Sequence, residues 1–176
     1  GDYPTSEPQL QLRLPTERYY EEEGRAELTP RDFGILMHRV FENAATTDEI
    51  YTAIEAMTQD GVLDEKEAPR LRELVEKALA DPVTAEWFGG RWQVVRNENE
   101  IILPGSGTTR RPDRVMTDGE RAVVVDYKFG DRETARHRKQ IREYLRLLRQ
   151  MGYTRTEGYL WYVRLGRTER VEEKED

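Results

Sequence analysis

Two acidic residues and a lysine near the middle of the chain have side chains that suit phosphodiester hydrolysis. Asp113 and Asp126 are 13 positions apart, and Lys128 follows the second acid by two positions. Two carboxylates that share a site repel each other, and a divalent cation relieves that repulsion most easily. A lysine beside such a cation stabilises the negative charge that gathers in the transition state. These residues therefore predict metal-dependent hydrolysis of a phosphodiester, provided that folding brings them together.

A predicted β-hairpin provides that proximity. The dipeptide Asp118-Gly119 favours a two-residue turn, and apolar residues flank it on both sides. Strands are therefore predicted over residues 111 to 117 and 121 to 128, with the two acids near the open end. Because side chains alternate along a strand, Asp126 and Lys128 project from the same face. The alternative for these residues is structural, with an acid capping a strand end and a solvated lysine.

The same residues resemble a known family signature. Pro112-Asp113 followed by Asp126-Tyr127-Lys128 is similar to the motif of the PD-(D/E)XK nuclease superfamily. The surrounding sequence resembles the RecB-like nuclease domains at the C-terminal end of bacterial helicase–nuclease subunits. Those domains also carry a Gly-x-x-x-His, a Glu before the first Asp, and a later Gln-x-x-x-Tyr. This chain has all three in the same order within a resemblance over roughly residues 29 to 165: Gly34 to His38, Glu98, and Gln140 to Tyr144.

The resemblance implies a cofactor and a role for each site residue. A Mg²⁺ or Mn²⁺ ion is expected to be held by His38, Asp113, Asp126 and the backbone carbonyl of Tyr127, with Glu98 contacting it through water. Lys128 is expected to orient or deprotonate the attacking water. Gln140 is expected to contact a phosphate or water, with support from Tyr144. Further phosphate contacts are expected from the basic residues Arg111, Arg114, Arg136 and Lys139.

The histidine lies on a predicted helix but away from its core-facing side. Thr29 and Pro30 have the residue types of a helix cap and a first turn. Apolar residues then recur at helical spacing, at Phe33, Leu36, Met37, Val40 and Phe41. His38 falls roughly 130° from the centre of that stripe, at about 100° per residue. It is therefore either a solvent-facing histidine or a side chain free to meet the two acids.

The remaining pattern predicts a mixed α/β (α+β) domain. Further helices are predicted over residues 48 to 57, 65 to 80 and 133 to 151, and strands over 92 to 96, 100 to 103 and 157 to 163. Trp87 and Phe88 are expected to fill the core. This order agrees with a restriction-endonuclease-like αβββαβ core, with a central mixed sheet and additional N-terminal helices.

Charge is distributed unevenly along the chain. The net charge is −7 and charged residues make up 36% of the sequence. Residues 105 to 155 hold 13 Lys and Arg against 7 Asp and Glu, whereas the rest holds 15 against 28. The basic part coincides with the candidate site and is a plausible phosphate footprint, although arginine-rich helices also serve solubility.

Composition restricts the location and organisation of the protein. The mean hydropathy is −0.88, and no apolar run approaches the roughly 18 residues that a membrane span needs. Without cysteine, the chain has no disulfides or thiolate zinc sites, which fits a cytoplasmic location without a membrane. Residues 1 to 28 are expected to be a linker or extended arm cut from a longer protein, 29 to 171 the nuclease domain, and 172 to 176 a charged tail.

The sequence thus predicts a metal-dependent DNA nuclease domain of a helicase–nuclease that processes DNA ends in recombinational repair. Its expected partners are DNA, a helicase region of the same longer chain, and a second subunit. Two alternatives remain open. One is a catalytically silent nuclease-like domain that binds DNA or a partner subunit, and the other is a protein-interaction domain with a structural Asp–Lys ion pair.

Overall fold

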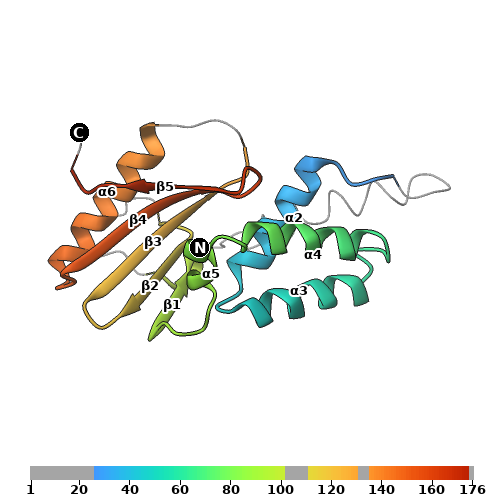
Figure 1. Cartoon of the computed structure of the whole chain (residues 1–176), viewed down its shortest axis with the longest axis horizontal. Coiled ribbons are helices and arrows are strands. Elements are labelled where there is room, and N and C mark those ends of the chain that lie inside the picture. The colour runs from blue at the N-terminus through green and yellow to red at the C-terminus, as the bar shows by residue number, and fades with distance from the viewer. Residues whose placement is uncertain (1–25, 102–110, 131–134, 175–176) are drawn as a thin grey trace, which may run out of the picture.

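The computed structural model describes residues 26–101, 111–130 and 135–174. A five-stranded mixed sheet lies between a group of helices on one face and one helix on the other (Figure 1). The group precedes the sheet: α2 (Pro30–Glu42), α3 (Thr47–Gln59), α4 (Glu67–Ala78) and α5 (Pro82–Trp87). The remaining elements are β1 (Val94–Asn97), the 3₁₀ helix η1 (Glu98–Glu100), β2 (Arg114–Asp118), β3 (Arg121–Lys128), α6 (Ala135–Gln150), β4 (Arg155–Tyr162) and β5 (Arg167–Val171).

The strands follow the chain in the order β1-β2-β3-β4-β5. All neighbouring pairs are antiparallel except β3 and β4, which are parallel and joined through α6. Parallel neighbours need a long crossover, and the helix between them supplies it. The order α2, β1 to β3, α6, β4 is the predicted αβββαβ order, with α3 to α5 inserted after α2. The predicted α+β fold class is therefore confirmed.

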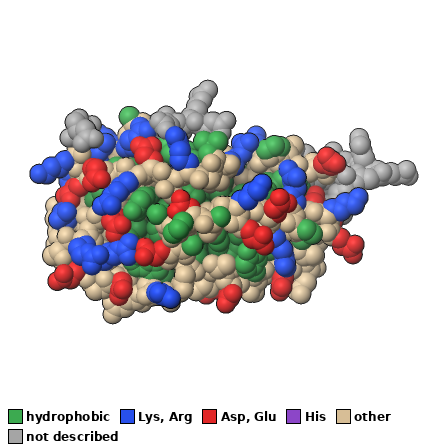
Figure 2. Space-filling model, in the orientation of Figure 1, with side chains coloured by type: hydrophobic (Ala, Val, Ile, Leu, Met, Phe, Trp, Pro, Cys, Tyr) green, Lys and Arg blue, Asp and Glu red, His purple; other side chains and the backbone are tan. Residues whose placement is uncertain are grey.

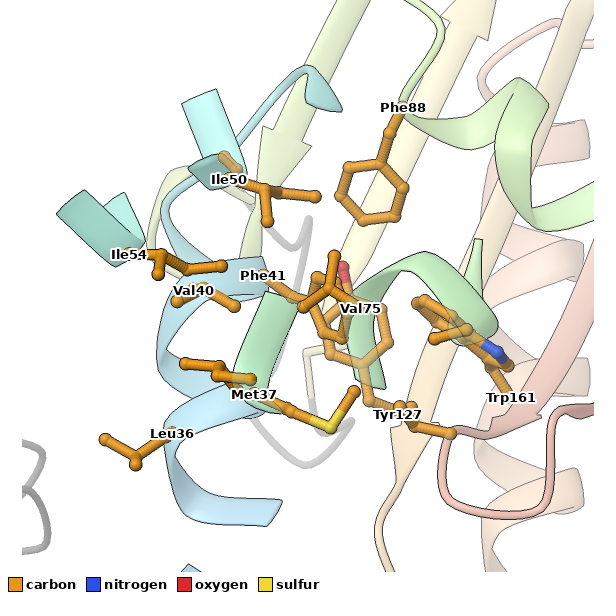
Figure 3. Close-up of a cluster of buried hydrophobic side chains, with 14 of the residues drawn as sticks. Leu36, Met37, Val40, Phe41, Ile50, Ile54, Val75, Phe88, Tyr127 and Trp161 are labelled. Atoms are coloured by element: carbon orange, nitrogen blue, oxygen red, sulfur yellow. The ribbon is translucent and has the colours of Figure 1, made fainter. Parts of the chain in front are cut away.

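Each face of the sheet has its own core. On one face, side chains of β3 such as Val123 and Tyr127 pack against α2 to α5, and on the other Ala122 and Val124 pack against α6. The first core is rich in aromatic rings, and Phe41 of α2 lies 5.0 Å from Trp161 between ring centroids. Figure 3 shows the apolar side of α2 directed at these strand residues. The alternation along β3 thus separates two cores and directs its even-numbered residues toward α6.

A capping box and a glycine explain where α2 begins and where the β2–β3 hairpin turns. Thr29 Oγ1 accepts a hydrogen bond from the Asp32 N–H at 3.1 Å, and an Asp32 carboxylate oxygen accepts one from the Thr29 N–H at 2.9 Å. This capping box fixes the start of α2, as predicted from Thr29. The hairpin between β2 and β3 turns at Gly119, whose φ of +59° suits glycine.

The structure differs from the predicted elements in three places. Residues 98–100 form the 3₁₀ helix η1 where a strand over 100 to 103 was expected, and residues 102 and 103 lie outside the described part. A short helix, α5, begins at Pro82, where no helix was predicted. The edge strand β5 was missed, because its charged sequence RTERV has a weak apolar alternation. None of the helices in the described ranges is both long and apolar enough to cross a membrane.

Candidate active site

The two aspartates stand side by side at the open end of the β2–β3 hairpin. Arg114 is paired with Val125 in the register, which places Asp113 and Asp126 opposite each other just beyond. The Asp113 backbone N–H donates to Asp126 Oδ1 at 3.0 Å, and the Tyr127 N–H donates to Asp113 Oδ2 at 2.7 Å. Each carboxylate is therefore held by a main-chain donor of the other strand. Both residues are buried, since only 6% of the surface of Asp113 and 3% of the surface of Asp126 are exposed.

His38 reaches this pair from α2. Its Nε2 lies 3.8 Å from Asp113 Oδ1, and about a third of its side chain is exposed. The imidazole stands edge-on to Tyr127 and Phe129, with ring centroids 6.2 and 5.6 Å away. The position of His38 outside the apolar stripe of α2 thus places it at the acids rather than in open solvent.

Acidic side chains dominate the electrostatics around the imidazole. Burial by itself would lower the pKa of His38, but the hydrogen bond and charge of Asp113 raise it above its ordinary value. The charges of Glu42 and Glu98 act in the same direction. Three carboxylates therefore create a negative potential at one point, which is the field that a cation needs. Glu98, predicted as an outer contact, is within electrostatic range of this point.

Lys128 ends the strand that carries Asp126. It is half-buried, and its backbone carbonyl accepts a hydrogen bond from the Val163 N–H at 2.9 Å. The alternation of β3 directs the Lys128 side chain to the same face as Asp126. The arrangement of Asp113, Asp126 and Lys128 on two paired strands is the arrangement that their sequence spacing predicts.

Comparison with known families decides the assignment. The sequence profile of the PD-(D/E)XK nuclease superfamily matches residues 9–176, nearly the whole chain. The chain belongs to the PD-(D/E)XK nuclease superfamily. A search of curated proteins gives no match. Members of this superfamily are generally nucleases and use divalent metal ions.

The side chains of Asp113, Asp126 and His38 are of the types that bind a hard divalent cation. Buried carboxylates of like charge and a neighbouring imidazole are the ligand types that Mg²⁺ and Mn²⁺ accept. Across the residues that the structure describes, no group of three or more His, Cys, Asp or Glu side chains is placed to hold a metal ion by itself. Mg²⁺ keeps several waters and often takes only one or two carboxylates, with substrate oxygens completing the shell. An open set of donors therefore fits such an ion.

Sequence reasoning missed Glu42 as a partner of His38. Its Oε2 lies 3.5 Å from His38 Nδ1, the nitrogen that faces away from Asp113. A carboxylate at the second nitrogen fixes the orientation of a histidine whose other nitrogen binds a metal. The i, i+4 spacing of His38 and Glu42 on a predicted helix was the available signal. Arg39 in turn holds Glu42 through a 2.7 Å hydrogen bond.

The structure contradicts the expected phosphate contact of Arg114. Its side chain is fully buried, and the guanidinium donates to the backbone carbonyls of Ala44 at 2.5 Å, Ala45 at 2.7 Å and Trp87 at 2.7 Å. It also lies 3.9 Å from the ring centroid of Phe88. A guanidinium committed in this way cannot reach a nucleic acid. Arg114 instead joins the helical part of the molecule to the strand that follows Asp113.

The site residues predicted on α6 differ in burial. Tyr144 is buried in the core between α6 and the sheet, which fits a supporting role. Gln140 is half-buried, and its side-chain oxygen Oε1 is buried without a hydrogen-bond partner in the described structure. Such an atom requires a partner from outside, either water or substrate. The basic residues Arg111, Arg136 and Lys139 are exposed.

Proposed function

We propose that this protein is a metal-dependent deoxyribonuclease that hydrolyses phosphodiester bonds at the Asp113–Asp126 pair. The observation that carries the proposal is the pair of hydrogen bonds, 3.0 and 2.7 Å long, that holds these two buried carboxylates together beside His38. Burying like charges in contact destabilises a fold unless a cation shares the site. Superfamily membership supports the same conclusion.

In this proposal the protein holds Mg²⁺ or Mn²⁺ with His38, Asp113, Asp126 and the backbone carbonyl of Tyr127. The ion supplies Lewis acidity toward a phosphate oxygen and makes water a better nucleophile. Glu42 orients the imidazole, and Glu98 adds negative charge at a greater distance. His38 must be neutral to act as a ligand, so a proton and the ion compete for its Nε2.

Lys128 acts on the reacting groups. In the proposal, its ammonium orients the attacking water and stabilises the added charge on phosphorus, whereas only its neutral amine can take the proton of that water. The unpartnered Oε1 of Gln140 accepts a hydrogen bond from a water in the site, while Tyr144 supports the helix that carries Gln140. Arg111, Arg136 and Lys139 contact the phosphates of DNA in this proposal, because their side chains are exposed and basic.

The finer assignment is to the RecB-like nucleases of bacterial helicase–nucleases. The ordered motifs Gly34 to His38, Asp113 to Lys128 and Gln140 to Tyr144 support it. In this proposal the domain works in the cytoplasm on DNA ends in recombinational repair. It is linked to a helicase region of the same longer chain and works with a second subunit.

A second candidate is a nuclease-like domain that binds DNA or a partner subunit without cleaving. The observation in its favour is the lack of a closed three-ligand set among the described residues. The two candidates differ in one outcome. The first cleaves DNA when a divalent ion is present, and the second does not.

The deciding experiment is cleavage of end-labelled linear and closed circular DNA with and without Mn²⁺. We expect Mn²⁺-dependent cleavage by the wild-type protein and none by Asp126→Asn. The amide still accepts the hydrogen bond from the Asp113 N–H, so this variant keeps the fold. Asp118→Asn, at the turn of the same hairpin, is the matched control and should cleave normally. Cleavage at the wild-type rate by Asp126→Asn would refute the proposal.

A further inference from the structure

Two adjoining hollows lead away from His38 along α2. The first has a volume of about 390 Å³ and is lined by His38, Phe129 and Arg31 among others. The second has a volume of about 400 Å³ and is lined by residues of α2, α4 and the β4–β5 turn. Both hollows include Pro30, Gly34 and Arg164 in their walls. They therefore adjoin, and we name them together the α2 groove, with His38 in the wall of one hollow and α4 residues in the wall of the other.

The α2 groove has a basic lining in an acidic protein. Its charged side chains, apart from His38, are Arg31, Arg70, Lys77 and Arg164, and no described Asp or Glu lines either hollow. The adjacent hollow, which shares Phe33 and Arg70, is different, because four acidic residues and only one further basic residue, Lys66, line it: Glu27, Asp64, Glu65 and Glu67. This contrast matters because the chain carries a net charge of −7.

The groove's cations are largely uncommitted to acidic partners. Within the described part of the chain, Arg31, Arg70 and Arg164 form no ion pair. Lys77 lies 3.9 Å from Glu73, but both side chains are exposed and such a pair contributes little. Other arginines are paired at short distance, as Arg121 is with Glu157 at 2.6 Å. The groove therefore offers free positive charge.

The floor of the groove is apolar and partly aromatic. Phe33, Met37, Leu74 and Val163 line the part near α4, and Phe129 lines the part near His38. The Arg70 guanidinium lies 5.3 Å from the ring centroid of Phe33. Figure 2 shows one face of the molecule, on which Lys and Arg side chains lie among Asp and Glu side chains and hydrophobic surface. Aromatic and apolar surface between separated cations is suited to unstacked bases with their phosphates.

Size favours one strand over two. Each hollow lies in the lower part of the range of about 300–1,000 Å³ that is typical of small-ligand sites. A duplex presents phosphates and sugars to such a surface and keeps its base faces stacked inside. An apolar floor gains contact only from bases that are already unstacked.

We propose that the α2 groove binds a single-stranded nucleic acid segment and leads it to the Asp113–Asp126 site. Arg31 and Arg164 contact phosphates where the two hollows join, and Arg70 and Lys77 contact them near α4. Phe129 offers a stacking surface beside His38. This inference rests on the proposed nuclease function for its direction, but the binding surface is defined independently of cleavage.

The test is binding of a fluorescent oligothymidylate in EDTA, which prevents cleavage, followed by anisotropy. The double variant Arg31→Glu and Arg164→Glu should bind at least about tenfold more weakly than the wild type. The slope of log affinity against log salt should decrease by about 0.7 for each phosphate that the variant no longer neutralises. Arg155→Glu, an exposed arginine outside both hollows, is the control and should bind as the wild type does. Both changed side chains are exposed, and thermal unfolding verifies that the variants fold.

Three results would overturn the proposal that the α2 groove binds a single-stranded nucleic acid. The first is wild-type affinity for the oligonucleotide in the double variant. The second is an equal loss of affinity in Arg155→Glu. The third is an equal loss of affinity for duplex DNA or polyglutamate, which would indicate a surface for any polyanion.

Cleavage of bis(p-nitrophenyl) phosphate with Mn²⁺ separates the groove from the nuclease proposal, because this small diester needs only the site. We expect the double variant to cleave it normally while losing cleavage of the oligonucleotide. If the wild type cleaves neither substrate but binds the oligonucleotide through the groove, the nuclease proposal fails and the groove stands.

Discussion

The two ends of the β2–β3 hairpin handle charge in opposite ways. At the turn end, Arg121 pairs with Glu157 at 2.6 Å and with Glu86 at 2.8 Å, so opposite charges meet at the protein surface. At the open end, Asp113 and Asp126 are buried side by side, so like charges meet in the interior. Charge is thus neutralised at the turn end of the hairpin, whereas negative charge is concentrated at its open end.

The contrast separates an end that serves stability from an end that serves function. Surface ion pairs contribute little but cost little, and they tolerate change. Buried like charges persist only where the surrounding structure holds them, here through the main-chain donors of Asp113 and Tyr127. The open end is therefore the part of the hairpin at which we propose cation binding.

The largest expected effect comes from the second acid of the motif. Asp126→Ala should abolish Mn²⁺-dependent DNA cleavage, because it removes a proposed cation ligand, whereas the conservative Asp118→Asn at the turn should not alter the rate. Initial rates on labelled linear DNA measure both. Equal rates for the two variants would remove the functional distinction between the two ends of the hairpin.

Lys128→Ala should reduce kcat by about 10²–10⁴-fold, because a group that assists proton transfer contributes roughly that much. Mn²⁺ binding should persist, since the ammonium is not a ligand. Single-turnover cleavage and a Mn²⁺ titration distinguish the two effects. Lys66→Ala, an exposed lysine before α4, serves as the control. Loss of Mn²⁺ binding in Lys128→Ala would contradict the proposed role.

The two arginines beside the hairpin ends should differ in their effect on stability. Arg114→Met leaves three backbone carbonyls without their donor, each worth about 1–3 kcal/mol, so the free energy of unfolding should fall by roughly 3 kcal/mol or more. Arg121→Met breaks surface pairs and should cost about 1 kcal/mol or less. Urea unfolding measures both. Similar losses for the two variants would contradict the contrast.

The ends should also respond oppositely to pH. The raised pKa of His38 means that its contribution is fully present below its unfolded value of 6.5 and is lost as pH rises through the higher folded value. In EDTA, the difference in unfolding free energy between the wild type and His38→Gln should shrink with rising pH. A difference that grows instead would show that the carboxylates do not act on the imidazole.

Glu157 should show the reverse dependence. Burial raises the pKa of Glu157, but the hydrogen bond and charge of Arg121 outweigh it and leave the pKa below its ordinary value. Its contribution is therefore present above the unfolded value of 4.5 and lost as pH falls through the lower folded value. Acid unfolding of Glu157→Gln against the wild type measures this small effect. An unchanged difference between pH 6 and pH 3 would contradict it.

Much of this arrangement was predictable from the sequence. The hairpin was predicted, and the alternation of β3 placed Asp126 and Lys128 on one face. The turn itself lies one residue later than predicted, at Gly119 and Glu120, because Asp118 pairs with Arg121. The helical period separated His38 from the core side of α2. In each case a local periodicity determines the direction of a side chain, so the sequence alone is sufficient.

What the sequence did not reveal depends on tertiary contacts. Arg114 follows Asp113 directly, so it looked like a phosphate ligand, but its three acceptors lie 27 to 70 residues away along the chain. The α2 groove joins α2, α4 and the β4–β5 turn, which no local pattern relates. The predictions for residues 1–25, 102–110, 131–134 and 175–176, including most of the arm and the end of the charged tail, lie outside the described residues.

Mn²⁺ binding followed by electron paramagnetic resonance tests the central claim most directly, because it requires no substrate. The wild type and Asp118→Asn should bind Mn²⁺ with equal affinity, and Asp126→Asn should bind it at least about tenfold more weakly. Equal Mn²⁺ affinity in all three proteins would contradict the claim that the buried carboxylates at the open end of the hairpin form a cation site.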